Sequence, residues 1–227
     1  MLPKLKILAL DASTEACSVA LWTDGEVLER FETGGRHSER ILPMVQEILA
    51  EGSQALTQLD AIAFGRGPGS FTGLRICAGV VQGLAFGADL PVVPVSSLAA
   101  LAQGVETPRV LAAFDARMHQ VYWGAYVRNA QGMAEPVGEE KVLTPMQVPV
   151  PDDAGWIGVG SGWDQYAAVL TARLKNRVAA WRAQCFPHAR FVAQLGAYLH
   201  EKGTALTPEQ ALPIYLRDNI AVKQTKP

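Results

Sequence analysis

The sequence has few of the residues that would place it in several large classes of protein. It has only three cysteines, Cys17, Cys77 and Cys185, in 227 residues, and none forms a Cys-x-x-Cys pair. An odd and widely spaced set offers no disulfide framework, so we expect reduced thiols in a cytoplasmic protein. Basic residues do not exceed acidic ones, because 20 Lys and Arg against 22 Asp and Glu give a net charge of −2. This balance disfavours a general nucleic-acid-coating protein, which would carry a basic face, but it leaves open a subunit that works beside a nucleic acid held by another chain.

Long apolar runs and secretory signals are also missing. The first ten residues, MLPKLKILAL, contain an apolar stretch too short for a signal peptide. The window that comes closest to a membrane span, residues 78–95, is interrupted by Gln82, Asp89 and two prolines. Hydrophobic residues make up 49% of the chain and charged residues 19%, as in an ordinary globular protein. We therefore expect no membrane partner.

The sequence lacks the histidine and serine patterns of several enzyme classes. None of its four histidines, His37, His119, His188 and His200, has a second histidine at ligand spacing. Residues 200–204, HEKGT, begin like a zincin motif but end in threonine. There is no Gly-x-Ser-x-Gly elbow. We expect no bound metal and no other cofactor, which disfavours a metalloprotease or a serine hydrolase of that type.

Apolar strands and amphipathic helices alternate along the chain. Asp24-Gly25 between two apolar runs predicts a β-hairpin. Ile41, Val45 and Ile48 recur at helical spacing, and Ser38 is the expected N-cap of that helix. For the first half we expect strands at 5–10, 17–22, 26–32, 59–65 and 90–95, and helices at 36–51, 71–87 and 96–104.

The second half repeats the pattern of the first. KILALDASTEACSVAL (6–21) and RVLAAFDARMHQVYWG (109–124) share an apolar run, an Asp-Ala pair and an alternating strand, so Asp11 and Asp115 hold equivalent places. A repeat of this length predicts two similar α/β lobes, which we divide into residues 1–105 and 106–227. The second lobe continues with a strand and glycine loop at 155–163, a helix at 190–203, and a tail expected to be ordered up to Arg217.

The stretch GRGPGSFTGLRI (65–76) resembles a phosphate loop only superficially. A Walker A loop ends in Gly-Lys-Ser/Thr, but here Gly73 is followed by leucine. The dinucleotide fingerprint requires a third glycine where this sequence has Thr72. We therefore predict a strand-to-helix turn, with Gly67 or Gly69 at positive φ and Ser70 or Thr72 as the cap.

The helix after this loop carries glycine at every fourth position, at Gly79, Gly83 and Gly87. Glycine costs up to about 1 kcal/mol relative to alanine inside a helix. A smooth stripe of this kind lets another backbone approach closely. The neighbour is either the protein's own sheet or a helix of another chain, and the spacing does not distinguish them.

The paired aspartates admit two interpretations. In a duplicated fold, Asp11 and Asp115 would face one interlobe cleft, where they could hold Mg²⁺ while Ser13 and Thr14 donate to a phosphate. Alternatively, each aspartate simply stabilises its hairpin turn. Arg117 and its neighbour Met118 would crowd the second phosphate hairpin, which favours a vestigial nucleotide cleft. An active ATP-dependent kinase or ATPase is the alternative.

Six segments in order resemble the TsaB family of bacteria, also called YeaZ, from about residue 6 to residue 220. They are DASTEACSVAL, GRGPGSFTGLRI, VSSL, FDARMHQVYWG, VGSGW and PIYLRDN. The resemblance implies an actin-like ATPase fold of the ASKHA, ribonuclease H-like superfamily with two duplicated lobes. It also implies a non-catalytic subunit in the synthesis of N6-threonylcarbamoyladenosine in tRNA, where a paralogous enzyme, TsaD, transfers the threonylcarbamoyl group and a small ATPase, TsaE, joins the pair.

The resemblance further implies where partners bind. Helices 36–51 and 71–87 would pack against the equivalent helices of TsaD, and the same surface could pair two copies of this chain. On that basis we expect the partner surface to comprise Ile41, Val45, Ile48, Arg75, Gly79 and Gly83.

Two details of the sequence bear on this resemblance. TsaD carries a metal-binding His-x-x-x-His, whereas this chain has only the first histidine in His37-Ser-Glu-Arg-Ile41, so no catalytic residue is expected there. Members of the family often have an acidic residue where this chain has Gln120, which puts in doubt any charge-dependent role at that position.

Overall fold

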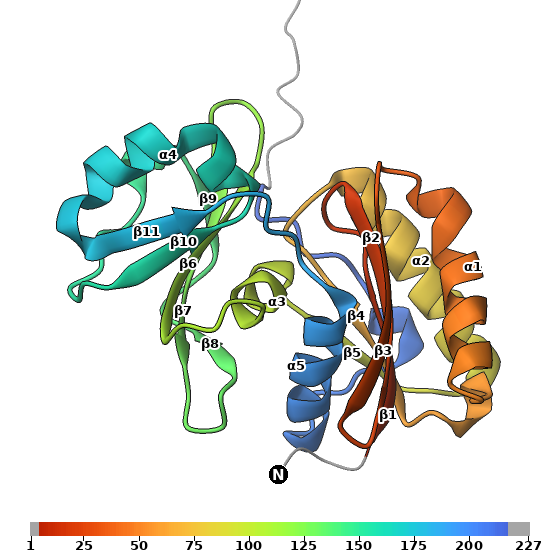
Figure 1. Cartoon of the computed structure of the whole chain (residues 1–227). Coiled ribbons are helices and arrows are strands. Elements are labelled where there is room, and N and C mark those ends of the chain that lie inside the picture. Colours follow the sequence, from red (N-terminus) through yellow and green to blue (C-terminus); the bar gives the residue numbers. More distant parts are fainter. Residues whose placement is uncertain (1–4, 218–227) are drawn as a thin grey trace, which may run out of the picture.

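Two β-sheets form the framework of the structure, a computed structural model that describes residues 5–217 (Figure 1). The first sheet has the strand order β3-β2-β1-β4-β5. Its strands are β1 (Lys6–Asp11), β2 (Ala16–Thr23), β3 (Glu26–Thr33), β4 (Ala61–Gly65) and β5 (Val92–Val95). β1 runs antiparallel to β2 and parallel to β4. The predicted Asp24-Gly25 hairpin is confirmed, with both residues at positive φ between β2 and β3.

The second sheet repeats this arrangement with the order β11-β10-β6-β7-β8. Its strands are β6 (Arg109–Asp115), β7 (Val121–Arg128), β8 (Ala134–Pro136), β10 (Trp156–Val159) and β11 (Val178–Arg182), and β9 (Lys141–Leu143) pairs with β7. β6 is antiparallel to β7 and parallel to β10, as β1 is to β2 and β4. The predicted duplication is confirmed, and the strand order is that of the ribonuclease H-like, actin-like ATPase fold.

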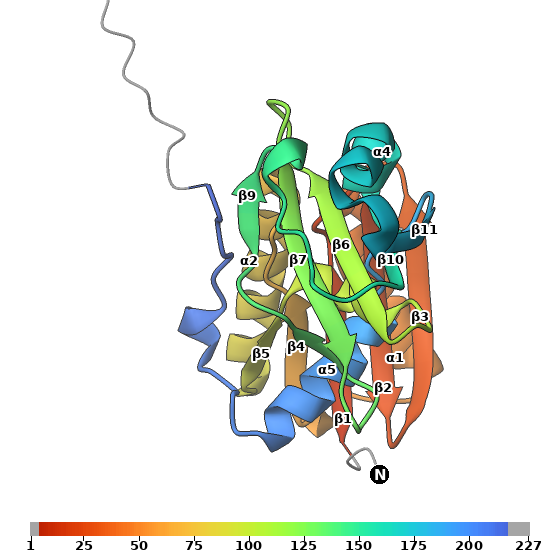
Figure 2. The same ribbon diagram turned by 90° about the vertical axis from the view of Figure 1, so that its left-hand side faces the viewer.

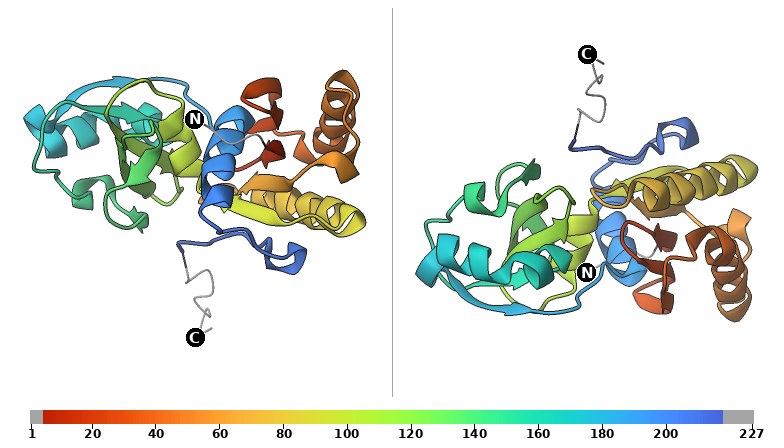
Figure 3. Two further views of the ribbon diagram at one scale, coloured as in Figure 1. Left: turned by 90° about the horizontal axis from the view of Figure 1, so that it is seen from below. Right: turned by 90° about the horizontal axis from the view of Figure 1, so that it is seen from above.

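Within residues 5–217, five α-helices cover the faces of these sheets. They are α1 (His37–Glu51), α2 (Phe71–Ala88), α3 (Ser97–Gln103), α4 (Ser161–Leu174) and α5 (Ala189–Glu201). Short 3₁₀ turns lie at η1 (Leu56–Gln58), η2 (Pro145–Gln147), η3 (Lys175–Arg177) and η4 (Pro208–Gln210). Viewed along a perpendicular axis, α1 and α2 lie on the outer face of the first sheet, and α5 lies between the two sheets (Figure 3). The expected Ser38 cap is wrong, because α1 begins at His37 with Arg36 as its N-cap.

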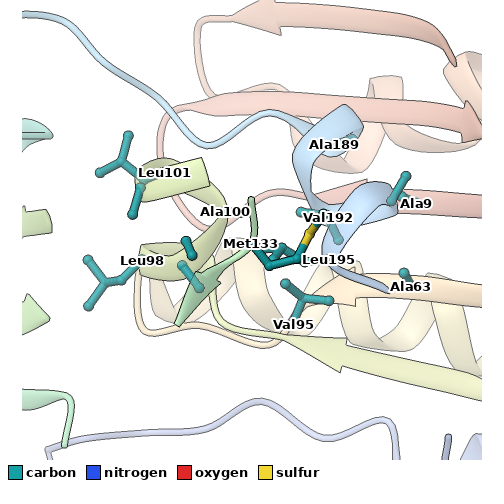
Figure 4. Close-up of a cluster of buried hydrophobic side chains, with 14 of the residues drawn as sticks. Ala9, Ala63, Val95, Leu98, Ala100, Leu101, Met133, Ala189, Val192 and Leu195 are labelled. Carbon is teal, nitrogen blue, oxygen red and sulfur yellow. The ribbon is translucent and has the colours of Figure 1, made fainter. Parts of the chain in front are cut away.

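The last helix of each half packs against the sheet of the other half. α3 follows β5 but packs on β6, β7 and β8, while α5 follows β11 but packs on β1, β2, β4 and β5. The two helices also pack on each other, in a core to which both sheets contribute (Figure 4). Gly196 of α5 lies so close to the first sheet that a Cβ there would be 2.6 Å from the Cβ of Ala63. The two sheets thus fall on either side of residue 105 in the sequence, whereas α5, which comes after that residue, packs on the first sheet.

The sequence did not predict α4 and β11. A glycine loop was expected after β10, but the connection from β10 to α4 is the single residue Gly160. This residue has a φ of +99°, and α4 starts directly after it. β11 is exposed at four of its five residues, but it begins with the apolar run VAAW (178–181), so a sequence signal for a strand was available. Hereafter the first lobe is the first sheet with α1, α2 and α5, and the second lobe is the second sheet with α3 and α4.

Candidate functional site

Asp11 ends β1 and is buried, with 1% of its surface exposed. Its Oδ1 accepts hydrogen bonds from the backbone amide and the hydroxyl of Ser13 at 2.8 and 2.7 Å, and its Oδ2 accepts one from the Ser97 hydroxyl at 2.9 Å. Burial raises the pKa of this carboxyl, although the hydrogen bonds from Ser13 and Ser97 act in the opposite direction. The carboxyl group of Asp11 therefore joins the β1–β2 turn to the start of α3. This is the second of the two interpretations, in which the aspartate stabilises its hairpin turn.

The glycine-rich loop between β4 and α2 packs directly on that turn. A Cβ at Gly69 or Gly73 would overlap a carbonyl oxygen of the turn. The Ser70 amide donates to the Ser13 carbonyl at 2.7 Å, and the Ser70 hydroxyl caps α2 by accepting from the Gly73 amide at 3.4 Å. The predicted strand-to-helix turn is confirmed, with Gly67 at a φ of +102°.

The second hairpin, between β6 and β7, differs from the first in exposure and shape. Asp115 is only partly buried, and its Oδ1 accepts from the backbone amide of Arg117 at 3.0 Å and from the hydroxyl of Tyr166 at 3.4 Å. Arg117, Met118 and His119 all lie in the left-handed region, with φ of 60°, 52° and 57°. Met118 is 77% exposed. Bulky side chains thus occupy the hairpin where a phosphate-binding turn would leave room.

A cleft of about 1230 Å³ lies between the two lobes. The predicted residues Ser13, Thr14 and Asp115 line it, as do Ser70, Tyr215 and Arg217. The prediction that both aspartates face this cleft is wrong for Asp11, because its carboxylate is buried and already takes three hydrogen bonds.

His37 serves to anchor the start of α1. It is 6% exposed, and its Nε2 lies 2.9 Å from the carbonyl oxygen of Thr14 in the β1–β2 turn. Four residues later, Ile41 is fully buried. Across residues 5–217, no three His, Cys, Asp or Glu side chains gather closely enough to hold a metal ion.

The outer side of α2 is exposed and mostly apolar or small. We call it the α2 face and define it by the exposed residues of that helix: Phe71, Thr72, Arg75, Gly79, Gly83, Phe86 and Gly87. A Cβ at Gly79, Gly83 or Gly87 would meet no atom within 4 Å. Within the described part of the chain, α2 alone is long and apolar enough to cross a membrane by length and composition, but its inner side packs on β1 and β4 as a core helix does. The glycine stripe therefore does not serve contact with the protein's own sheet.

Comparison with known proteins identifies the family. A family model described as tRNA N6-adenosine threonylcarbamoyltransferase, TsaD, matches residues 32–224. The chain is 43% identical to the tRNA threonylcarbamoyladenosine biosynthesis protein TsaB of Escherichia coli K12, over 97% of this chain and 98% of that relative. The protein of the same name from Haemophilus influenzae is 41% identical, over 97% of each chain. The chain belongs to the TsaB (YeaZ) family.

A solved structure supports the same assignment. YeaZ from Pseudomonas aeruginosa is 48% identical in sequence and superposes with a TM-score of 0.86, covering 93% of this chain and 100% of that chain. The TsaB family assignment thus rests on sequence and fold together.

Three residues expected on the partner surface of this TsaB family member are not on any surface. Ile41, Val45 and Ile48 are 0%, 2% and 0% exposed and belong to the core beneath α1 and α2. Helical spacing identified an apolar side of α1 correctly, but that side faces the sheet. As surface residues of the free protein, these three predictions were wrong.

The other three expected residues, Arg75, Gly79 and Gly83, are exposed on the α2 face. The guanidinium of Arg75 lies 3.7 Å from the ring centroid of Phe71. Two further residues of the α2 face that were not predicted, Phe71 and Phe86, are 45% and 57% exposed. The signal was available, because Phe86 is three residues after Gly83 and hence on the same side of the helix.

Proposed function

We propose that this chain is the non-catalytic subunit of the complex that transfers threonylcarbamoyl from threonylcarbamoyl-AMP to N6 of the adenosine beside the anticodon in tRNA. It binds and activates a TsaD-type catalytic paralogue in the cytoplasm. A TsaE-type ATPase joins the pair, and tRNA is met only through the complex. The proposal is supported by the names of the closely similar TsaB relatives and by the TsaD family model that spans most of the chain.

The observation that carries the proposal is the α2 face. Phe71 and Phe86 are large apolar side chains left half-exposed on one helix, with three open glycines beside them. Exposed aromatic and arginine side chains are enriched at protein interfaces, and small residues allow two helices to approach closely. A helix of the paralogue can therefore lie along the glycines, with Arg75 at one end of the contact.

A single substitution separates binding from folding. A Cβ at Gly83 would meet no atom within 4 Å, and Gly83→Leu replaces glycine in a helix interior, so it should stabilise the free chain by roughly 0.5–1 kcal/mol. The same side chain should obstruct a close helix–helix contact and weaken binding at least about tenfold, as overpacking at an interface predicts. The measurements are a calorimetric titration with the TsaD-type protein and urea unfolding of the free variant.

Ala168→Leu is the matched control. Ala168 is exposed on α4 in the second lobe, so the added side chain there should leave the affinity unchanged. Normal binding by Gly83→Leu would contradict the assigned surface, and absence of any complex with the wild-type chain would contradict the function. Self-association of the wild-type chain that Gly83→Leu abolishes would show that the α2 face also pairs two copies. ATP turnover by the purified chain alone would contradict a non-catalytic role.

A further inference from the structure

The C-terminal segment 205–217, which we call the strap, follows the first lobe and ends on the second. Leu206 pairs with Val92 of β5 through two backbone hydrogen bonds of 2.8 and 2.9 Å. Ala211 is buried, and the Gln82 side chain of α2 donates to its carbonyl at 3.3 Å. Figure 2 shows the strap passing α5, β5 and α2 along one edge of the molecule.

On the first lobe, the strap is fastened to the beginning of α2. The ring of Tyr215 packs on that of Phe71 with a centroid separation of 5.4 Å. Arg75 donates from Nε to the Tyr215 hydroxyl at 3.0 Å. Two residues of the α2 face, Phe71 and Arg75, therefore contact the strap directly.

On the second lobe, the strap is fastened to the β6–β7 hairpin by one residue. Arg217 donates to the carbonyl oxygen of Ala116 at 3.0 Å and to Oε1 of Gln120 at 2.6 Å. These two acceptors stand on either side of the three left-handed residues 117–119.

A second connection between the lobes lies next to the strap. Arg66 follows β4, and its carbonyl accepts from the Ile214 amide of the strap at 2.8 Å. Its guanidinium lies 3.9 Å from the carboxylate of Glu140, which also accepts hydrogen bonds from the hydroxyls of Ser96 and Tyr126. The strap thus joins a polar network that already links the two lobes.

We propose that the strap sets the angle between the lobes and transmits partner binding on the α2 face to the interlobe cleft. Tyr215 and Arg217 line that cleft, so a shift of the strap changes its wall. Because Phe71 and Arg75 belong to both the α2 face and the strap contact, a partner that engages them also moves the strap. That the strap sets the angle between the lobes is a statement about the free chain. Only the response of the strap to a partner rests on the proposed function.

The first test is Arg217→Ala in the free chain. Native-state hydrogen exchange should be at least about tenfold faster at the amides of Gln120 and Ile214, as loss of a charged hydrogen bond predicts. Arg109→Ala is the matched control, because Arg109 pairs with Asp153 inside the second lobe and should leave both rates unchanged. Unchanged rates in Arg217→Ala, or faster exchange at Gln120 alone, would overturn the proposal.

The second test measures the lobe angle. Spin labels at Glu26→Cys and Ala168→Cys, in a Cys185→Ser background, place one exposed label on each lobe. Arg217→Ala should broaden the distance distribution, and an unchanged distribution would overturn the proposal. Addition of the TsaD-type protein should shift the wild-type distribution but not that of Arg217→Ala. If the paralogue binds without any shift, the transmission is refuted; if it does not bind at all, the proposed function fails while the free-chain result stands.

Discussion

At the scale of single residues, two aspartates in equivalent places of a repeat have different surroundings. Asp11 is buried and takes hydrogen bonds from Ser13 and Ser97, whereas Asp115 is partly exposed and pairs with the Arg117 guanidinium at 3.3 Å. The difference arises because the loop between β4 and α2 packs on the first hairpin, whereas the equivalent connection between β10 and α4 is the single residue Gly160. The Asp11 carboxyl group therefore holds the β1–β2 turn to the start of α3.

Asp11→Asn should keep the fold, since its amide oxygen can accept from Ser13 and its amide nitrogen can donate to the Ser97 hydroxyl. Burial raises the pKa of Asp11 above its ordinary value of 3.8, despite the hydrogen bonds it accepts. The stability that its protonated form contributes is complete below pH 3.8 and is lost as the pH rises through the raised pKa. The variant should therefore gain stability relative to the wild type as the pH rises above 3.8.

Urea unfolding of both proteins from about pH 3 to about pH 7 measures this difference. Asp11→Ala is the contrasting variant, because it leaves the Ser13 and Ser97 hydroxyls without their acceptor. It should lower the free energy of unfolding by at least about 2 kcal/mol. A pH-independent difference between Asp11→Asn and the wild type would contradict the assignment.

At the scale of elements, the glycines on the two sides of α2 have opposite surroundings. Gly73 in the first turn lies against the β1–β2 turn, where there is no room for a Cβ, while Gly83 faces open space. The first glycine allows a contact within the chain. The second leaves a smooth outer surface, at a cost in helix stability of up to about 1 kcal/mol relative to alanine.

The substitutions Gly73→Ala and Gly83→Ala should therefore change the free energy of unfolding in opposite directions. Gly73→Ala forces the β1–β2 turn away and should destabilise by about 1–3 kcal/mol. Gly83→Ala should stabilise by up to about 1 kcal/mol. Chemical denaturation of the two variants side by side checks both signs, and the same sign in both would refute this account of the helix.

At the scale of the whole molecule, the lobes are joined by exchanged helices. α5 returns to the first sheet, and its entry is held by Glu29 of β3. The Glu29 carboxylate accepts from the Arg190 amide at 3.1 Å, and it lies 3.3 Å from Nδ1 of His188. Burial alone would raise the pKa of Glu29, but the hydrogen bonds and charges of His188 and Arg190 outweigh it and lower that pKa.

Glu29→Gln should destabilise the protein at neutral pH and much less in acid. Because the folded-state pKa is lowered, the contribution of Glu29 is present above its ordinary value of 4.5 and is lost as the pH falls through the lowered pKa. The stability difference from the wild type, measured by urea unfolding across this range, should shrink as the pH falls.

Glu47→Gln is the control for this acid dependence. Glu47 is 46% exposed in its surface pair with Arg40, so its loss should cost less than about 1 kcal/mol. A stability difference between Glu29→Gln and the wild type that grows in acid would contradict the role assigned to Glu29.

Helical spacing found the apolar side of α1 but could not tell whether that side meets the sheet or a partner. Ile41 and Ile48 therefore appeared equally suited to both, and only the packing of α1 on β2 resolved it. β11 was not predicted although it begins with the apolar run VAAW (178–181), because a short apolar run without alternation does not by itself distinguish a strand from part of a helix.

The sequence by itself determined the repeated succession of strands, the turn into α2 and the four-residue spacing of the glycines on that helix, because these depend on the spacing of residues near one another in the chain. Only the tertiary structure decided which aspartate is buried, where α3 and α5 pack, and that Arg217 reaches the β6–β7 hairpin. Arg217 and Ala116 are 101 residues apart in the chain, and Ser97 and Asp11 are 86 residues apart. Local spacing carries no information about such contacts, which form only when the whole chain folds.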